Sequence, residues 1–202
     1  MKDILLTILR NRSCSKSEFR SASKKLGAIL AYETSMLLPR HRTEVDTPLA
    51  KFPGSVLQNG ILIVPILRSG LALLPPFLDY FEFARVGFVG MKRDEETAIP
   101  HKYYDNLPTI HPDDDTIILE PMIATGGSVC GTLQFLKDRG VREEKMIVVS
   151  IIGATEGTEL LRKEFPKSRL VIAQQDTELN HQKYILPGLG DFGDRYFGTE
   201  HP

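Results

Sequence analysis

The chain has 202 residues, a formal net charge of −1 and 42% hydrophobic residues, which is the composition of an ordinary globular protein. A single domain is expected at this length, and such a chain buries enough surface to fold without disulfides or metals. The near-zero charge argues against a nucleic-acid-binding protein with a basic face, but it leaves room for a local pocket for one small anion.

Cysteine usage and hydropathy predict a cytoplasmic protein. Cys14 and Cys130 form no CxxC pair, so we interpret both as reduced thiols. The apolar stretch within MKDILLTILRNR is too short to span a membrane and has no small-residue cleavage site after it, so neither a signal peptide nor a membrane partner is expected. The five histidines show no metal-ligand spacing, so no zinc site built from the protein alone is expected.

Hydrophobic periodicity predicts helices that alternate with short apolar strands. An amphipathic helix is expected at 17–38, ending before Pro39. The later elements, in chain order, are a strand at 61–67, a helix at 71–81 with a proline pair in its first turn, strands at 84–91 and 115–123, a helix at 128–140, a strand at 145–153, a helix at 156–165 and a strand at 168–175. This order indicates an α/β fold with a central, mostly parallel sheet flanked by helices. Ligands bind such sheets at the carboxyl ends of the strands.

The segment TIILEPMIATGGSVCGT (116–132) carries the strongest functional signal. A buried strand ends at the acid Glu120, and ATGGS then leads into a helix, so backbone amides, two hydroxyls and a helix N-terminus form a cradle for an anion. Glu120 would lie beside this cradle, where carboxylates commonly hold ribose hydroxyls or a metal. The residues expected to hold a phosphate are Ala124, Thr125, Gly126, Gly127 and Ser128.

Two better-known phosphate loops do not fit this segment. Its glycine spacing is G-G-x-x-x-G and not the dinucleotide fingerprint G-x-G-x-x-G, and Thr132 stands where a P-loop requires Lys. A G-x-G-x-x-G match does occur at 188–193, but it does not lie between a strand and a helix of a βαβ unit. A plain glycine-containing turn is the remaining alternative, and the order strand, acid, T-G-G-S and helix argues against it.

TIILEPMIATGGS resembles the phosphoribosyl-diphosphate (PRPP) motif of type I phosphoribosyltransferases, and in detail that of the uracil phosphoribosyltransferase branch. Three further segments are similar to that branch: VPILRSG (64–70), the charged arm with RDEET (90–108) and YILPGLGDFGDRYFGTE (184–200). The branch usually has Asp where this chain has Glu120, so we expect PRPP binding to survive with some loss of geometry. The resemblance implies a core at about 20–168, a projecting β-arm at about 90–112 and a C-terminal, base-binding hood at about 169–202.

The resemblance implies roles for the matching residues. Arg68 and Arg93 would contact the diphosphate of PRPP, because a planar guanidinium suits two phosphate oxygens at once. Asp191 would lie near the diphosphate side of the ribose and is the candidate general base, which makes these three the expected catalytic residues. Uracil would be bound largely by backbone groups that match its O2, N3–H and O4 and reject cytosine. The segment expected to line the base contains Tyr184, Ile185, Gly190, Asp191 and Phe192.

The implied reaction converts uracil and PRPP into UMP and diphosphate, with Mg²⁺ arriving on PRPP and not in a protein cage. The resemblance further implies a homodimer or homotetramer formed through the arm, GTP as an effector, and a non-proline cis peptide in the loop at 64–70. Two alternatives stay open: a phosphoribosyltransferase for another base, and a non-catalytic regulatory relative of the same fold.

Overall fold

The computed structural model describes residues 1–93 and 100–199, without the side chains of Arg93 and Pro100. Its helices are α1 (Lys2–Arg10), α2 (Lys16–Ser35), α3 (Leu74–Tyr80), α4 (Gly127–Asp138), α5 (Thr155–Glu164) and α6 (Phe192–Phe197), with the short 3-10 helices η1 (Ser69–Ala72) and η2 (Glu143–Lys145). Its strands are β1 (Arg40–Asp46), β2 (Lys51–Leu57), β3 (Ile61–Leu67), β4 (Arg85–Val86), β5 (Phe88–Arg93), β6 (Pro100–Asn106), β7 (Asp115–Leu119), β8 (Met122–Ile123), β9 (Met146–Ala154), β10 (Arg169–Asp176), β11 (Glu178–Leu179) and β12 (Ile185–Leu186). None of the helices described is long and apolar enough to cross a membrane.

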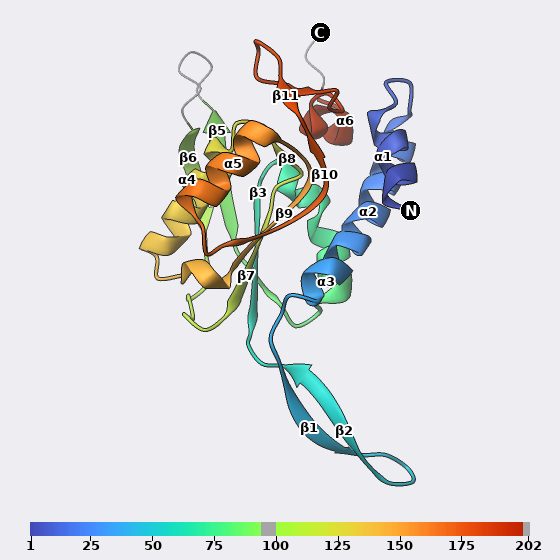
Figure 1. Ribbon diagram of the computed structural model, residues 1–202, viewed down its shortest axis with the longest axis vertical. Coiled ribbons are helices and arrows are strands. Elements are labelled where there is room, and N and C mark those ends of the chain that lie inside the picture. The colour runs from blue at the N-terminus through green and yellow to red at the C-terminus, as the bar shows by residue number, and fades with distance from the viewer. Residues whose placement is uncertain (94–99, 200–202) are drawn as a thin grey trace.

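One eight-stranded sheet organises the chain (Figure 1). Its main strands follow the order β10-β9-β7-β3-β5-β6, with β4 paired to β3 and β8 paired to β9. Every pair in this sheet is parallel except β5 with β6, which form an antiparallel arm. After β3 the chain runs to β5 on one side and returns to β7 on the other, which is the switch point at which such sheets bind ligands. The predicted α/β fold with a mostly parallel sheet is confirmed.

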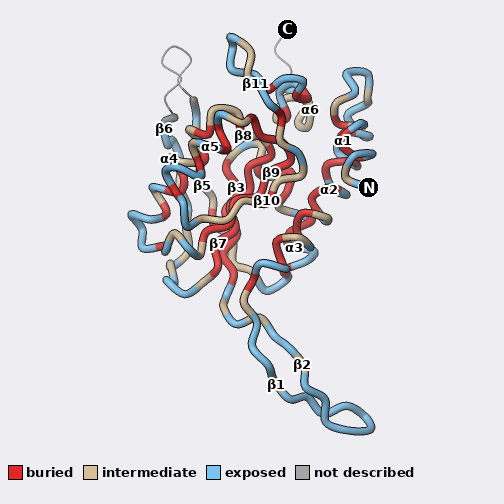
Figure 2. The backbone as a smooth tube through the Cα atoms, viewed as in Figure 1, coloured by how far each residue is buried: buried red, intermediate tan, exposed pale blue. Residues whose placement is uncertain are grey.

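Alternate side chains of the central strands face two different helical layers. Ile61 and Ile63 of β3 pack in one cluster with buried residues of α1, α2 and α3. Leu62 and Val64 pack in a second cluster with buried residues of α4 and α5. Because both faces are covered, the central strands are buried along their length, which Figure 2 shows as red tube in the middle of the molecule.

Local signals set the helix boundaries. The Ser15 hydroxyl accepts a hydrogen bond from the Glu18 amide at 3.2 Å, and the Glu18 carboxylate accepts one from the Ser15 amide at 2.7 Å, so a capping box starts α2. The helix expected at 71–81 is instead η1 followed by α3. Pro75 and Pro76 stand in the first turn of α3, where their missing amide donors do no harm.

The structure corrects the sequence interpretation in further places, and the strand expected at 84–91 is divided into β4 and β5. No element was expected between residues 39 and 60, yet β1 and β2 form an antiparallel hairpin that projects from the body (Figure 1). The strand expected at 115–123 is broken into β7 and β8, because Pro121 lacks an amide donor while its carbonyl accepts from both Ile151 and Ile152. The C-terminal segment, expected to be irregular, contains α6, and Gly193 lies inside this helix.

A buried carboxylate ties α1 to the C-terminal segment. Asp176 at the end of β10 is 5% exposed and accepts hydrogen bonds from the Arg10 guanidinium at 2.6 and 2.9 Å. It also accepts one from the Gly188 amide at 3.1 Å, and Arg10 donates to the Gly188 carbonyl at 2.9 Å. These bonds hold the segment around Gly188 against α1 and the end of β10.

We expect Asp176→Asn to lower the free energy of unfolding by about 2 kcal/mol, because it leaves the partly buried Arg10 guanidinium without its counter-charge. Urea denaturation measures the change. Asp79→Asn is the matched control, since Asp79 pairs with Lys24 at 3.6 Å where both side chains are exposed, and its loss should cost less than about 1 kcal/mol. Equal losses in the two variants would contradict the role of Asp176.

Candidate active site

A cavity of about 400 Å³ lies at the carboxyl ends of β3 and β7. Its walls come from segments that are far apart in the sequence: residues 66–69, Met91, Glu120 with 122–129, 182–185 and 190–193. The parallel pairing of β3 with β7 brings the first of these segments together, and the C-terminal segment supplies the last two.

Every predicted site residue other than Arg93 lines this cavity: Arg68, Glu120, Ala124, Thr125, Gly126, Gly127, Ser128, Tyr184, Ile185, Gly190, Asp191 and Phe192. The Arg93 side chain lies outside the described residues, and only the backbone of β5 is described up to that position. Met91, two residues earlier on the same strand, lines the cavity, so the β5–β6 arm contributes to it from its base.

The cradle at 124–128 is built by close backbone contacts. Gly126 has a φ of +83°, and a Cβ atom there would lie 2.7 Å from the Gly157 carbonyl oxygen. A Cβ atom at Gly157, in the first turn of α5, would in turn collide with the Ala124 carbonyl. The first intrahelical bond of α4 runs from the Cys130 amide to the Gly126 carbonyl at 2.9 Å, so the amides before it have no partner within the helix. This start of α4 is therefore suited to bind an anion.

The loop after β3 is joined to the end of β7. The Leu67–Arg68 peptide is cis, and a Cβ atom at Gly70 would collide with the Leu119 carbonyl. The Ser69 hydroxyl donates to the Glu120 carboxylate at 2.9 Å. The Arg68 side chain stays 59% exposed, with its guanidinium 3.7 Å from the Asp194 carboxylate, so it remains accessible to a ligand.

Glu120 is a buried acid in the cavity wall. It is 7% exposed and accepts hydrogen bonds from the Ser69 hydroxyl and, at 3.5 Å, from the Met122 amide. Burial raises the pKa of its carboxyl to about 7; the two hydrogen bonds oppose this rise, and the charge of Asp191 adds to it. Glu120 therefore changes its protonation state near neutral pH.

The C-terminal segment contributes Gly190, Asp191, Phe192 and Gly193 to the cavity wall. The Phe192 ring is 1% exposed and packs against the rings of Phe19 and Tyr196, with centroids 5.1 and 5.8 Å apart. Its side chain is thus part of the core. Asp191 caps α6 by accepting a hydrogen bond from the Asp194 amide at 2.8 Å.

Several cavity residues were not identified from the sequence, among them Ser69, Gln182 and Lys183. Ser69 follows Arg68 directly, so its hydroxyl was a usable signal, but its bond to Glu120 depends on the alignment of two strands. Gln182 and Lys183 lie in a polar stretch that is typical of an exposed turn, and nothing local separates them from other surface residues.

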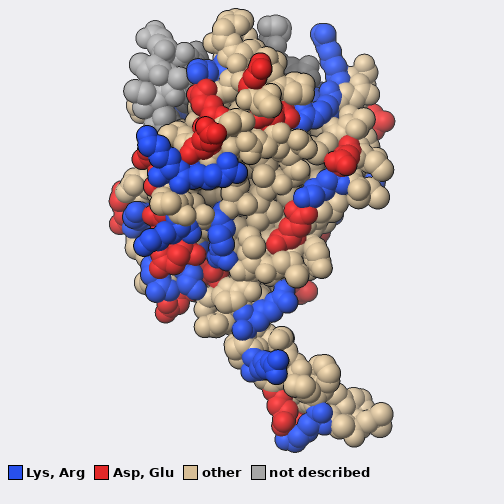
Figure 3. Space-filling view, in the orientation of Figure 1, with Lys and Arg blue, Asp and Glu red and all other residues tan. Residues whose placement is uncertain are grey.

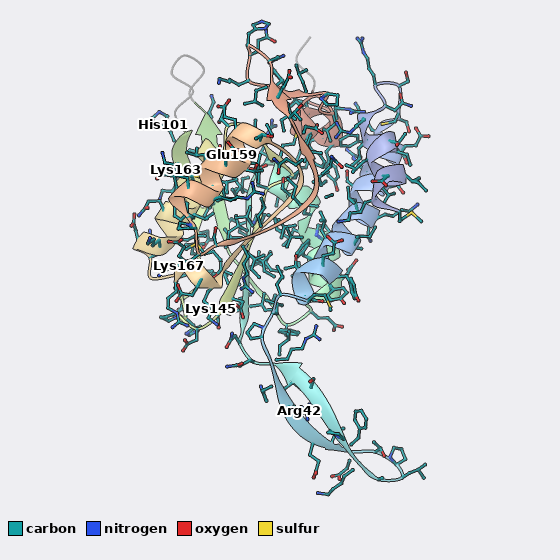
Figure 4. The ribbon with its side chains drawn as sticks, in the orientation of Figure 1. Arg42, His101, Lys145, Glu159, Lys163 and Lys167 are labelled. Carbon is teal, nitrogen blue, oxygen red and sulfur yellow. The ribbon has the colours of Figure 1, made fainter. Side chains whose placement is uncertain are left out.

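Charge outside the cavity is mixed. On the face drawn in Figure 3, Lys and Arg side chains are interspersed with Asp and Glu. Lys145 and Lys167 lie near the amino ends of β9 and β10 (Figure 4), whereas the cavity lies at the carboxyl ends of the strands. The Lys145 ammonium is 3.8 Å from the Asp115 carboxylate. Positive charge at the cavity therefore comes from groups in the cavity wall and not from a basic surface around it.

We expect Glu120 to make the protein less stable as the pH rises. Its folded pKa of about 7 lies above the ordinary value of 4.5, so the folded chain binds this proton more tightly. The resulting stabilisation is fully present below about pH 4.5 and is lost as the pH rises through about 7, a fall of up to about 3 kcal/mol. Urea denaturation of wild type and Glu120→Gln across this range isolates the effect, and parallel curves would contradict it.

Known proteins resemble this chain over nearly its whole length. Residues 2–199 match the family model described as uracil phosphoribosyltransferase. A uracil phosphoribosyltransferase from Dictyoglomus thermophilum is 42% identical over 196 residues, which are 96% of this chain and 94% of the relative. The solved structure of the AQ2163 protein from Aquifex aeolicus has a TM-score of 0.90 at 33% identity and covers 100% of this chain and 96% of its own.

A more distant structure bears on the fold alone. A hypoxanthine-guanine phosphoribosyltransferase from Bacillus anthracis has a TM-score of 0.53 at 11% identity, over 79% of this chain and 80% of its own. The α/β fold of type I phosphoribosyltransferases and the resemblance found in the sequence are both confirmed. This chain belongs to the uracil phosphoribosyltransferase family.

Proposed function

We propose that the protein transfers the phosphoribosyl group of PRPP to N1 of uracil, forming UMP and diphosphate. In this reaction the N1–C1 bond forms as the bond from C1 to the diphosphate oxygen breaks, and N1 loses its proton. The observation that carries the proposal is that one cavity is lined by the 124–128 cradle, by Arg68 and by the 184–192 segment. The cradle would bind the 5′-phosphate, Arg68 the diphosphate, and the 184–192 segment the base.

The phosphate groups are bound by backbone and by Arg68. Free amides at the start of α4 suit the 5′-phosphate, which carries charge in both the ground state and the transition state. The exposed guanidinium of Arg68 suits the diphosphate, on which negative charge builds up as it departs. A second contact from Arg93 stays a prediction.

Glu120 fits the role of holding the ribose hydroxyls. Ser69 and Met122 orient its carboxyl, and a group that titrates near pH 7 can both accept and donate a hydrogen bond. Asp191 has one oxygen engaged in the α6 cap, which leaves the other free. Its role as the base that receives the N1 proton stays a prediction.

The base site uses backbone atoms. Because the Phe192 ring is buried against Phe19, a large side chain at this position leaves the cavity open. A fixed amide donor beside O4 of uracil would face the amino group of cytosine, and an unpaired buried donor costs about 1–3 kcal/mol. Gly190, with a φ of +80°, lets the chain turn at the wall of this site.

The carboxylates of the cavity fit a divalent cation that is bound together with PRPP. Glu120 and Asp191 both line it, and their mutual repulsion contributes to the raised pKa of Glu120. Mg²⁺ prefers carboxylate and phosphate oxygens with water, and when bound it would neutralise charge on the leaving diphosphate. Glu120 and Asp191 are the residues that would hold it. Among the described residues, no group of three or more His, Cys, Asp and Glu is placed to hold a metal ion.

Labelled uracil, PRPP and Mg²⁺ with purified protein test the proposal, with UMP followed by chromatography. We expect UMP from wild type and a loss of about 100-fold or more in kcat/KM for Arg68→Ala, because a group that stabilises the leaving charge is removed. The Arg68 side chain is mostly exposed, so the variant should fold normally and serves as the control for contaminating activity.

The other outcomes of this assay separate the alternatives. Turnover with hypoxanthine, adenine or orotate but not uracil would contradict the base assignment. PRPP binding without turnover of any base would favour the non-catalytic relative.

We further propose that identical chains associate, and that the β1–β2 hairpin makes the main contact in place of the arm at 90–112. The hairpin projects from the body and is exposed over most of its length (Figure 2). An isolated two-stranded hairpin is only marginally stable in water, so it is expected to pack against something. A second copy of this chain is the proposed occupant, because closed homo-oligomers are the commonest assemblies. The large apolar side chains exposed on the hairpin are Val45, Leu49, Phe52 and Val56.

Phe52→Glu is expected to shift the protein from oligomer to monomer, because it places a charge in an apolar contact. Light scattering coupled to size exclusion measures the mass. Ile4→Glu is the control, since Ile4 is 61% exposed on α1 and Phe52 is 56% exposed. A monomeric wild type, or an unchanged mass for Phe52→Glu, would contradict the proposed contact.

The proposal includes an effector and a cellular location. A GTP effector is supported by the resemblance alone. A cytoplasmic location is supported by Cys14 and Cys130, which are both free thiols.

A further inference from the structure

Lys183 has an unusual backbone conformation for its residue type. Its φ is +63°, and no other non-glycine residue among those described has a positive φ. It ends the turn that joins β11 to β12: its amide donates to the Asn180 carbonyl at 2.9 Å, and the Asn180 amide donates to the Tyr184 carbonyl at 2.8 Å. Glycine is the usual residue at this position of a three-residue hairpin loop, so a lysine here is strained and calls for a reason beyond the turn itself.

Lys183 lines the same cavity as the 124–128 cradle. Of the described residues in the cavity wall, Arg68 and Lys183 are the cations, and Glu120 and Asp191 are the acids. A substrate with both a phosphate and a diphosphate offers several anionic oxygens to a cation in the cavity wall. Lys183 is the other cation that the described wall offers.

The present partner of Lys183 places it next to the cradle. Its ammonium lies 3.3 and 3.4 Å from the two carboxylate oxygens of Glu156, in the first turn of α5. The next residue, Gly157, is the one whose backbone packs against Ala124 and Gly126. The β11–β12 hairpin stands beside α5 at the upper edge of the sheet (Figure 1). The ammonium is therefore paired with the residue that directly precedes Gly157, one of the backbone supports of the cradle.

The Lys183–Glu156 pair contributes little as a structural bond. The side chains are 44% and 51% exposed, and pairs as exposed as this one are worth little in water. Such a pair breaks readily when a dianion offers the ammonium a better partner.

We propose that Lys183 is a substrate-binding residue whose ammonium leaves Glu156 and binds the 5′-phosphate in the 124–128 cradle. The inference rests on the proposed function, since it assigns a residue to the phosphate of PRPP and UMP. Glu156 then acts as a competitor that holds the lysine when no phosphate is bound. The strained turn keeps Lys183 at the cavity wall in both cases.

The pairing with Glu156 allows a phosphate-binding role of Lys183 to be distinguished from a structural one. If Lys183 binds phosphate, Lys183→Gln weakens UMP binding, whereas Glu156→Gln strengthens it by freeing the ammonium. If the pair only fastens the hairpin to α5, both substitutions disturb the same contact and change binding in the same direction. The two variants therefore change UMP affinity in opposite directions if Lys183 binds phosphate, and in the same direction if the pair is only structural.

The experiment measures UMP and PRPP affinities by calorimetry for wild type, Lys183→Gln, Lys183→Arg and Glu156→Gln. We expect UMP binding about tenfold weaker in Lys183→Gln, near wild type in Lys183→Arg, and about twofold tighter in Glu156→Gln. In the steady state, KM for PRPP should rise in Lys183→Gln with kcat unchanged, because the phosphate contact is the same in the ground and transition states. Inorganic diphosphate, which lacks the 5′-phosphate, should bind all four proteins alike.

The variant Lys183→Gly tests whether a loss of UMP affinity results from misfolding of the turn. Glycine tolerates a φ of +63°, so this variant should unfold at a urea concentration no lower than wild type and still lose UMP affinity. Unchanged UMP affinity in both Lys183→Gln and Lys183→Gly, or weakening in Glu156→Gln, would overturn the inference. A wild type that binds neither PRPP nor UMP would instead contradict the proposed function.

Discussion

The parallel pairing of β3 with β7 is the constraint on which the rest of the cavity depends. Five residue pairs, from Ile61 with Asp115 to Pro65 with Leu119, set the two strands in register. This register brings the loops that follow them to the same level, where Gly70 abuts the Leu119 carbonyl and Ser69 reaches Glu120. A shift of one residue would turn the buried side chains of β3 to the wrong helical layer and would separate these two loops.

Electrostatics inside the cavity follow from that placement. A strand that ends at an acid and is covered on both faces leaves Glu120 poorly solvated, which raises its pKa toward neutrality. Around it the protein supplies backbone amides and a few separate cations, and not a basic surface. This arrangement explains how a chain of net charge −1 can bind a highly anionic substrate: the positive groups are few and local, and the fold brings them to one place.

In the C-terminal segment, residues that pack in the core also line the cavity. Asp176 holds the segment to α1, the Phe192 ring enters the core beside Phe19, and Asp191 caps α6. The proposed recognition of the base uses backbone groups, and these contacts hold the backbone in place. A recognition surface made in this way tolerates side-chain changes that keep the packing, because the hydrogen-bonding atoms belong to every residue alike.

The sequence by itself determined the alternation of helices and strands, and it pointed to Glu120, the 124–128 cradle and Arg68, because these signals are local: apolar runs, glycines at strand ends and a motif contiguous along the chain. It did not reveal the β1–β2 hairpin, whose strands bury neither face and so carry no hydrophobic alternation. Only the tertiary structure decided that Ser69 donates to Glu120, that the Phe192 ring faces the core, and that Lys183 adopts a strained turn at the cavity wall. Each of these depends on strand register or on packing between distant segments, which no short stretch of sequence encodes.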